Sequence, residues 1–316
     1  MASISLPPSY TGVVHPAPMV PIVPSPPNVP PSVPPSATAS VTPFIPPSAP
    51  PMDLENYRMM CYKAVADKYD IRADFCAKLR KLEDYEIILV ADDSGSMNTR
   101  VVEGTTVSAA NALASASATG AFAPSRTRWT ELLEFSNIVT DIASIMDRSG
   151  MDIYFLNRPP LLNVTSSSDP RLAMAFSRFP SGSTPLVKTL QNIIHTKCRA
   201  NMERRFLIII ATDGVPDEGA NELFNTIKYR PSNVNISILA CTDDEAAVSY
   251  MNKIDRCVPG VDVVDDYRSE RIEIQRHQGA SYSFSYGDYV VKVLLGSIDP
   301  EMDRLDESGV GCCDVM

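Results

Sequence analysis

The residues Tyr85-Glu-Ile-Ile-Leu-Val-Ala-Asp-Asp-Ser-Gly-Ser-Met97 decide the fold of this 316-residue chain. The run from Tyr85 to Ala91 is short, apolar and rich in branched side chains, as is typical of a strand buried inside a parallel sheet. The polar residues Asp92 to Ser96 follow at the point where that strand ends. In an open α/β sheet, ligands collect in the crevice at the carboxyl ends of the strands. This stretch therefore predicts both an architecture and the place of a site.

Four more apolar runs with the length of strands follow, and helical patterns separate most of them. The strands are expected over 151–156, 205–212, 234–240 and the weaker 261–264, and the helices over 129–148, 185–199, 217–229, 243–256 and 289–305. Strands that alternate with helices predict an α/β fold, with a doubly wound, mainly parallel sheet flanked by helices.

The connection 97–127 does not fit this alternation. It joins the first strand to its helix, and its centre is rich in Ala, Ser and Thr without large apolar residues. Connections in α/β units usually take about 2 to 6 residues. We therefore expect a loop insertion, at the end of the sheet that carries Asp92.

Composition divides the chain into four segments. Residues 1–51 hold seventeen of the 27 prolines and no Lys, Arg, Asp or Glu, a composition that favours extended polyproline II segments without a packed core. They are predicted to form a disordered arm. Good helix formers over 52–84 predict a helical extension, the α/β domain is expected over 85–305, and 306–316 is predicted to be a flexible tail.

Charge and cysteine usage exclude several classes of protein. The formal charge of −10 falls on residues 53–316, and a domain with a pI of about 4.9 lacks the basic surface that nucleic acids require. No secretory leader follows Met1 and no apolar run reaches the ~18 residues of a membrane span, so a cytoplasmic, non-secreted chain is expected. No CxxC spacing occurs, which argues against zinc sites and disulfides. Five cysteines are expected to be buried reduced thiols, namely Cys61, Cys76, Cys198, Cys241 and Cys257.

Oxygen-bearing side chains gather where three predicted elements begin or end. Asp92, Ser94 and Ser96 follow the first strand, Thr184 lies on a Gly-containing loop before a helix, and Asp213 follows the third strand. Hydroxyl and carboxylate oxygens without His or Cys suit Mg²⁺, Mn²⁺ or Ca²⁺ rather than zinc, and Mg²⁺ is the ion we expect. Two carboxylates only balance the charge of such an ion, so an Asp or Glu carboxylate of a partner protein can replace a bound water.

These residues resemble the metal-ion-dependent adhesion site of the von Willebrand factor A family, in a domain that covers about two thirds of the chain. The resemblance implies the α/β fold of that family, a metal held by the five residues just named, and metal-dependent protein binding. The chain is also similar to a fungal intracellular branch of the family in the stretches 92–97, 128–129, 152–157 and 291–297. The insertion departs from that branch, so access to the metal does not carry over.

Residues beside the motif have simpler expected roles. Asp93 either steadies the loop by a hydrogen bond or stays solvated. Trp129 is expected in the core, because a helix follows it at once. Phosphate chemistry normally needs a Lys or Arg clamp, and apart from the unplaced Arg100 and Arg126 the motif loops offer none. An enzyme is therefore not expected.

The last residues carry a lipidation motif. Cys313-Asp-Val-Met316 matches a prenylation box whose terminal residue favours farnesyl, and Cys312 is a candidate for palmitoylation. One lipid chain anchors a protein only marginally, and no polybasic patch precedes the box, so a second lipid is the natural further anchor. The alternative is two exposed cysteines on a frayed tail.

The proline-rich arm contains two short peptides of the kind that other domains bind. Leu6-Pro7-Pro8-Ser9-Tyr10 is a WW-domain type of ligand, and Pro47-Ser48-Ala49-Pro50 resembles the peptides that UEV domains read. A proline-rich segment produces such tetrapeptides easily, so a plain spacer is the alternative.

Three functions follow from these features. The first is a non-enzymatic, metal-dependent protein-binding module, tethered by lipid to the cytosolic face of a membrane. The second is a scaffold whose arm carries the interactions while a structural metal only fastens loops. The third and least favoured is a Mg²⁺-dependent hydrolase or phosphotransferase, with Asp92 or Asp93 as the nucleophile.

Overall fold

The computed structural model describes residues 53–101, 126–242 and 245–306. The proline-rich arm, the greater part of the predicted insertion and the C-terminal cysteine motif therefore lie outside the described residues. The chain divides into two units, Met1–Pro50 and Pro51–Met316, and the second unit contains every described residue.

A six-stranded sheet with the order β3-β2-β1-β4-β5-β6 forms the centre of the second unit. Its strands are β1 (Tyr85–Ala91), β2 (Met151–Phe155), β3 (Leu161–Val164), β4 (Arg205–Thr212), β5 (Val234–Ala240) and β6 (Val261–Val264). All neighbouring strands pair in parallel except β3, which is antiparallel to β2. The predicted α/β class with a mainly parallel sheet is confirmed.

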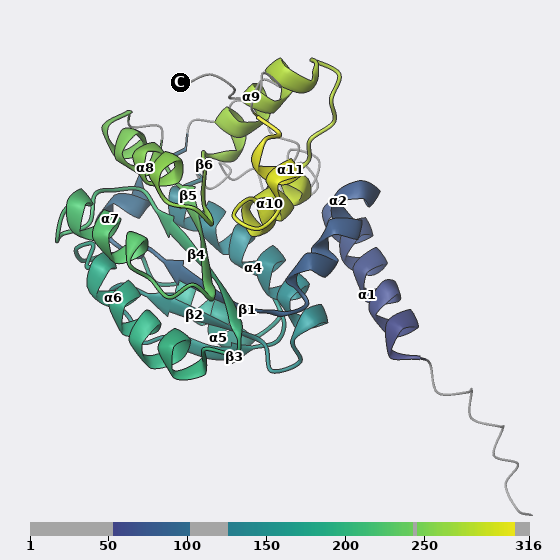
Figure 1. Ribbon diagram of the computed structural model, residues 1–316, viewed down its shortest axis with the longest axis horizontal. Coiled ribbons are helices and arrows are strands. Elements are labelled where there is room, and N and C mark those ends of the chain that lie inside the picture. The colour runs from purple at the N-terminus through teal and green to yellow at the C-terminus, as the bar shows by residue number, and fades with distance from the viewer. Residues whose placement is uncertain (1–52, 102–125, 243–244, 307–316) are drawn as a thin grey trace, which may run out of the picture. The chain divides into compact units, whose positions relative to one another are not determined.

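Helices cover both faces of the sheet. Figure 1 shows α6 (Leu186–Ile193), α7 (Ala220–Lys228) and α8 (Glu245–Cys257) on one side, and α4 (Arg128–Met146) and α10 (Tyr286–Leu295) on the other. The alternation along β1 supplies both cores: Ile87, Leu89 and Ala91 pack toward α4 and α10, whereas Ile88 and Val90 pack toward α6. A strand buried on both faces explains why its sequence is apolar at every position except the half-buried Glu86.

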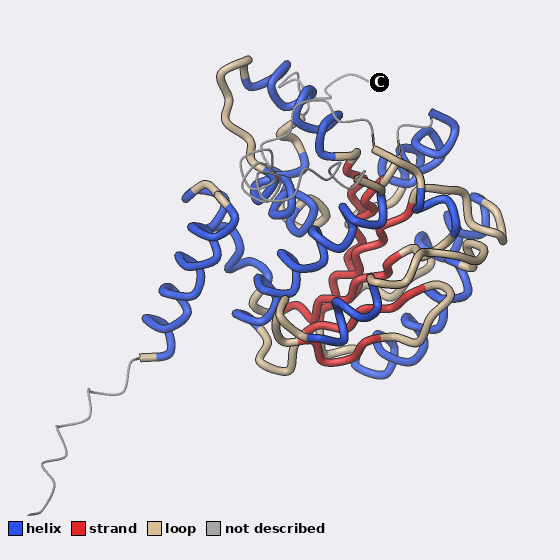
Figure 2. Tube along the Cα trace, turned by 180° about the vertical axis from the view of Figure 1, so that it is seen from behind, coloured by secondary structure: helices blue, strands red, loops and turns tan. Residues whose placement is uncertain are grey.

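The remaining helical segments are short or lie at the periphery. They are α1 (Leu54–Tyr69), α2 (Ala73–Lys78), α5 (Pro170–Phe176), α9 (Tyr267–Gln278) and α11 (Pro300–Asp303), the 3₁₀ turns η1 (Leu79–Leu82), η2 (Gly95–Asn98) and η4 (Arg199–Asn201), and the π turn η3 (Ile194–Cys198) that continues α6. Figure 2 shows from behind how helices and strands alternate around the sheet.

Three expectations about these elements were wrong or incomplete. The single helix predicted over 289–305 is broken, because Asp299 before Pro300 is held in the extended region and caps a new turn. Strand β3 and helix α5 were not predicted. Nor was α9, in which Ile274 is the one apolar residue among its buried residues, so that its sequence lacks an apolar stripe.

The five described cysteines that were predicted to be reduced are free thiols, but only Cys198 is buried. Cys257 is exposed at the end of α8, and the other three are half-buried. The expectation of burial was therefore wrong for four of them. No helix among the described residues combines the length and the apolarity that crossing a membrane demands.

The base of the predicted insertion is paired. Arg100 and Thr127 form an antiparallel bridge, with Val101 N–H donating to Arg126 O at 2.9 Å and Arg128 N–H donating to Thr99 O at 3.1 Å. Thr127 then caps α4. Val101 and Arg126, which flank the segment 102–125, therefore lie side by side.

The N-terminal helices dock on the start of α10. The Arg72 N–H donates to Asp288 Oδ1 at 2.8 Å, and Ser285 Oγ donates to the carbonyl oxygen of Asp70 at 2.6 Å. Gly287 allows this approach, because a Cβ there would overlap the carbonyl oxygen of Tyr69.

We expect Gly287→Ala to destabilise the domain by about 1 to 3 kcal/mol, since backbone must move to admit the added methyl group. The measurement is thermal unfolding followed by circular dichroism in the presence of a chelator. Gly214→Ala is the matched control, because a Cβ at Gly214 meets no atom within 4 Å. Equal melting temperatures for the two variants would contradict this account of the docking.

Candidate metal centre

Two of the predicted metal ligands come together because their strands are neighbours. Asp92 follows β1 and Asp213 follows β4, and these strands pair in register up to Ala91 and Ala211. The Asp92 N–H continues the ladder by donating to Ala211 O at 2.9 Å. Both carboxylates are therefore placed at the carboxyl edge of the sheet, where the residues Asp92 and Asp213 are 1% and 5% exposed.

The loop after β1 is shaped by the first of these carboxylates. The Ser94 N–H donates to Asp92 Oδ1 at 2.8 Å, which turns the chain immediately after the strand. The short turn η2 follows, and its Met97 is fully buried in the core beneath the loop. This anchor fixes the positions of the two serine hydroxyls between Asp92 and Met97.

The serine loop links the two carboxylates, through the Ser94 N–H at Asp92 and the hydroxyl groups of Ser94 and Ser96 on the side of Asp213. Ser94 Oγ and Ser96 Oγ lie 3.0 Å apart, and Ser96 Oγ donates to Asp213 Oδ1 at 2.7 Å. Four of the five predicted ligands, Asp92, Ser94, Ser96 and Asp213, thus form one hydrogen-bonded chain. Ser94 is buried whereas Ser96 is exposed, so the chain leads from the protein interior to its surface.

Thr184 reaches the same edge through its loop. The Gly95 N–H donates to Gly182 O at 3.2 Å, which joins the serine loop to the Thr184 loop. Asp217 holds Thr184 in turn: Asp217 Oδ1 accepts from the Thr184 N–H, and the Asp217 N–H donates to Thr184 O, both at 3.0 Å. Among the described residues, no hydrogen bond joins the Thr184 side chain to the other four predicted ligands.

This use of Asp217 also corrects a predicted helix. The helix expected from residue 217 begins at Ala220, because Asp217 serves the Thr184 loop and Gly219 adopts a φ of 90° that ordinary residues avoid.

Asp92 is a carboxylate whose charge is poorly solvated. Its second oxygen, Oδ2, accepts a hydrogen bond from Thr212 Oγ1 at 2.6 Å. Burial raises the pKa of Asp92 above its ordinary value, although the hydrogen bonds from Thr212 and Ser94 act in the opposite direction. The charge of Asp213 adds to the increase. A bound cation would offset both of these unfavourable contributions.

Arg128 occupies this site as well, which the sequence analysis did not foresee. As the first residue of α4, it donates from Nη1 to Asp213 Oδ2 at 2.8 Å and from Nη2 to Thr242 Oγ1 at 3.1 Å. The expectation that no basic residue other than Arg100 or Arg126 reaches the motif was therefore wrong. Its signals in the sequence are its place at the start of a helix whose N-terminus faces the carboxyl edge and the resemblance in the stretch 128–129.

Asp93 is fully buried, so the alternative of a solvated carboxylate was wrong. Its Oδ1 accepts from the backbone N–H of Asn157 at 2.8 Å, and its Oδ2 pairs with Arg158 Nε at 2.9 Å. Its carbonyl oxygen accepts from the Ser181 N–H at 2.8 Å. Asp93 therefore ties the loops after β1 and β2 to the loop that carries Thr184.

Trp129 lies in the core, as predicted. It is 4% exposed, its ring stacks on Phe176 with 4.3 Å between ring centroids, and its Nε1 donates to Phe176 O at 2.9 Å. The guanidinium carbon of Arg158 lies over the Trp129 ring, 5.0 Å from the ring centroid. Trp129 thus supports the residues around the site without belonging to it.

The two histidines that an enzyme mechanism could use as bases are both exposed. His195 lies on η3 and His277 near the end of α9. His195 lines a shallow cavity of about 320 Å³ together with Gln191, Thr226 and Tyr229. Gln191 and Thr226 lie in the C-terminal halves of α6 and α7, and His195 and Tyr229 follow the ends of these helices, so the cavity lies at the opposite end of the sheet from Asp92.

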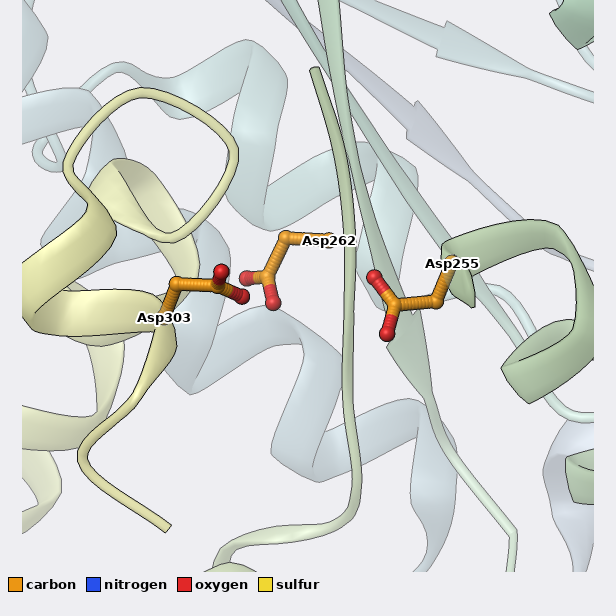
Figure 3. Close-up of side chains that lie close together, drawn as sticks. All are labelled: Asp255, Asp262 and Asp303. Carbon is orange, nitrogen blue, oxygen red and sulfur yellow. The ribbon is translucent and has the colours of Figure 1, made fainter. Parts of the chain in front are cut away.

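A second set of acidic residues that could hold a metal ion was not predicted. Asp255, Asp262 and Asp303 each place one carboxylate oxygen within 4.8 Å of the others (Figure 3). The one signal in the sequence is Asp262 itself, a charged residue inside the apolar run Val261-Asp-Val-Val264.

No model of a known protein family matches this sequence, and a search of curated proteins finds no match either.

Proposed function

We propose that this chain is a von Willebrand factor A-like, metal-dependent protein-binding module. In this proposal Asp92, Ser94, Ser96, Thr184 and Asp213 hold one Mg²⁺, and a carboxylate of the partner completes its shell. The observation that supports it is the set of hydrogen bonds that joins Asp92 to the Ser94 backbone N–H, Ser94 Oγ to Ser96 Oγ, and Ser96 Oγ to Asp213, at the carboxyl edge of a parallel sheet. Mn²⁺ and Ca²⁺ suit the same oxygen ligands.

The donor set fits such an ion. Every group is a hard oxygen, and two carboxylates with three neutral hydroxyls leave the ion able to attract a further anion. Most of these residues are buried while Ser96 is exposed, so an ion at the end of the chain of hydroxyls would face solvent and a partner. Asp93 and Asp217 would keep the three loops in place around it.

Affinity capture tests this function. The full chain is used to capture proteins from cytosol in Mg²⁺ and in EDTA, alongside Asp92→Asn. A partner retained only with Mg²⁺ and intact Asp92 supports a metal-bridged contact, and blocking acidic residues of that partner must release it. Identical captures under all three conditions would refute the metal-bridged contact and favour the alternative scaffold, in which the arm carries the interactions.

Arg128 favours a second candidate, a Mg²⁺-dependent phosphoester hydrolase or phosphotransferase. A guanidinium that contacts Asp213 stands where phosphate chemistry would need a positive charge. Turnover of a generic phosphoester that requires Mg²⁺, Asp92 and Arg128 together would support this candidate. The absence of such turnover leaves the binding module.

The proposal extends to location. Lipids on Cys313 and Cys312 would tether the module to the cytosolic face of a membrane, with the arm free to offer its WW-type and UEV-type peptides. Mass spectrometry of the C-terminal peptide decides whether these cysteines carry lipids.

The contact between Arg128 and Asp213 leads to a prediction about metal affinity. Its charge already neutralises Asp213, so it competes with a cation for that carboxylate. We expect Arg128→Met to strengthen Mg²⁺ binding about tenfold, because one repulsive charge near the ion is removed. Isothermal titration measures the change. Arg126→Met is the matched control, since Arg126 pairs with Glu131 and Glu134 on α4 instead. Weaker binding in Arg128→Met would show that Arg128 holds Asp213 in its binding position.

A further inference from the structure

Three carboxylates from distant parts of the sequence meet beside the edge strand β6. Asp262 lies in that strand, Asp255 near the end of α8, and Asp303 at the end of α11. Figure 3 shows the carboxyl groups of Asp262 and Asp303 turned toward one another, with Asp255 approaching from α8. One oxygen of each lies within 4.8 Å of the others. Three negative groups this close repel one another unless something positive lies between them.

Asp262 is the residue that points to a ligand. It is 3% exposed, and its Oδ2 is fully buried without a hydrogen-bond partner among the described residues. A buried oxygen without a partner loses its hydration without compensation, and the cost is greater for a charged group. Asp255 and Asp303 are partly exposed and also interact with other groups. The uncompensated oxygen is therefore the one deepest in the cluster.

The neighbouring backbone makes room for this carboxylate and offers no side chain to bind it. A Cβ at Gly296, directly after α10, would occupy the position of Asp262 Oδ2. Any residue other than glycine there would displace the Asp262 side chain. The chain thus holds a charged group where an apolar residue would fill the same space without a hydrogen-bonding requirement.

The buried Lys292 does not neutralise the cluster of Asp255, Asp262 and Asp303. Lys292 on α10 is 1% exposed, and its Nζ pairs with Glu270 Oε1 at 3.1 Å and with Asp306 Oδ1 at 3.5 Å. It attracts Asp262 electrostatically, but the ion pairs of its ammonium group go to Glu270 and Asp306. The single positive charge of Lys292 is thus shared among Asp262, Glu270 and Asp306, while Asp255 and Asp303 add negative charge beside Asp262.

We propose that Asp255, Asp262 and Asp303 bind one divalent cation, for which Ca²⁺ is the probe, at a second site that is separate from the one at Asp92. All three oxygens lie within 4.8 Å of one another, which is close enough to share one ion, because ligand oxygens on opposite sides of Ca²⁺ stand about 4.6 to 5.2 Å apart and those around Mg²⁺ about 4.0 to 4.2 Å apart. Water completes the shell on the exposed side. The ion fastens α8 and α11 to the edge strand and supplies the partner that Asp262 Oδ2 lacks.

A bound proton is the competing explanation. Burial raises the pKa of Asp262 to about 8, so a proton can also neutralise this carboxyl group. The two explanations differ in one measurable respect, because only a cation site makes stability depend on Ca²⁺ concentration.

The test uses the full chain with Asp92→Asn, in which the first site is disabled. We expect Ca²⁺ at one hundred times its Kd to raise the melting temperature of this variant by about 5 °C or more. Calorimetry should count one Ca²⁺ per chain. The double variant Asp92→Asn/Asp262→Asn should lose both effects, and Asp92→Asn/Asp303→Asn should bind at least tenfold more weakly. Asp92→Asn/Asp67→Asn is the control, since Asp67 is exposed on α1.

Unfolding does not confuse the result, because Asp262→Asn removes an uncompensated charge and should melt no lower than the parent variant in EDTA. A Ca²⁺ effect that is missing from Asp92→Asn, or that persists in the double variant, overturns the proposal. Asp262→Asn alone should still capture the partner in Mg²⁺, so that failure here is distinguishable from failure of the proposed function.

Discussion

Asp92→Asn is expected to lower the affinity of the carboxyl-edge site for Mg²⁺ at least a hundredfold. Asp92 supplies one of the two negative charges of the site, and Mg²⁺ replaces its tightly held water only for strong oxygen ligands. The amide that replaces the carboxylate can still accept from the Ser94 N–H and can donate to Thr212 Oγ1, so both present contacts have substitutes. The fold should persist, and titration calorimetry with Mg²⁺ and with Mn²⁺ measures the loss.

Two comparisons make this result specific. Asp67→Asn carries the same chemical change at an exposed position and should bind Mg²⁺ like the unaltered chain. Circular dichroism should show the same helix and strand content in both variants. An Asp92→Asn chain that is folded and binds Mg²⁺ with undiminished affinity would exclude the site described at the ends of β1 and β4.

Lys292→Met should produce the largest loss of stability of any single change considered. Lys292 and Glu270 are 1% and 2% exposed at their side chains, and their charged atoms lie 3.1 Å apart. The attraction of Glu270, Asp262 and Asp306 raises the pKa of Lys292, against the effect of burial. Removing one member of such a pair leaves buried negative charge uncompensated, which costs about 3 to 5 kcal/mol. Urea unfolding in EDTA at neutral pH measures it.

The double variant Lys292→Met/Glu270→Gln separates charge from packing. If the uncompensated carboxylate causes the loss, neutralising Glu270 should restore part of the stability. Lys68→Met is the control, because Lys68 pairs with Asp141 at 2.7 Å while 54% of its side chain is exposed, and exposed pairs contribute about 1 kcal/mol or less. A loss in Lys292→Met no greater than that in Lys68→Met would show that the buried pair contributes little.

The sequence predicted those parts of the fold whose signal is continuous along the chain. The run from Tyr85 to Ala91 is apolar except at Glu86 because β1 is buried on both faces, and β2, β4, β5 and β6 likewise consist mostly of buried apolar residues. Strand β3 could not be predicted this way, since it lies at the edge with Leu162 exposed and Asn163 at a φ of 55°.

The residues of the candidate sites also differ in whether the sequence alone could place them. Asp92 and Asp213 could be placed together because each directly follows a strand, and parallel strands end at one edge. Arg128 could not be placed, since its contact with Asp213 depends on the direction of a long side chain. Asp255, Asp262 and Asp303 come together only through the packing of α8 and α11 around β6, which no spacing in the sequence records.

The bridge between Arg100 and Thr127 has an evolutionary consequence. Because the segment 102–125 begins and ends at adjacent backbone positions, its length can change without moving either end. Closing a flexible loop costs only about 0.6 kcal/mol more for each doubling of its length. Descendants of this chain can therefore gain, lose or exchange residues in that segment while the domain and the residues of the candidate metal centre stay intact. Natural selection can therefore alter this segment, and with it the surroundings of the candidate metal centre, at little cost in folding free energy.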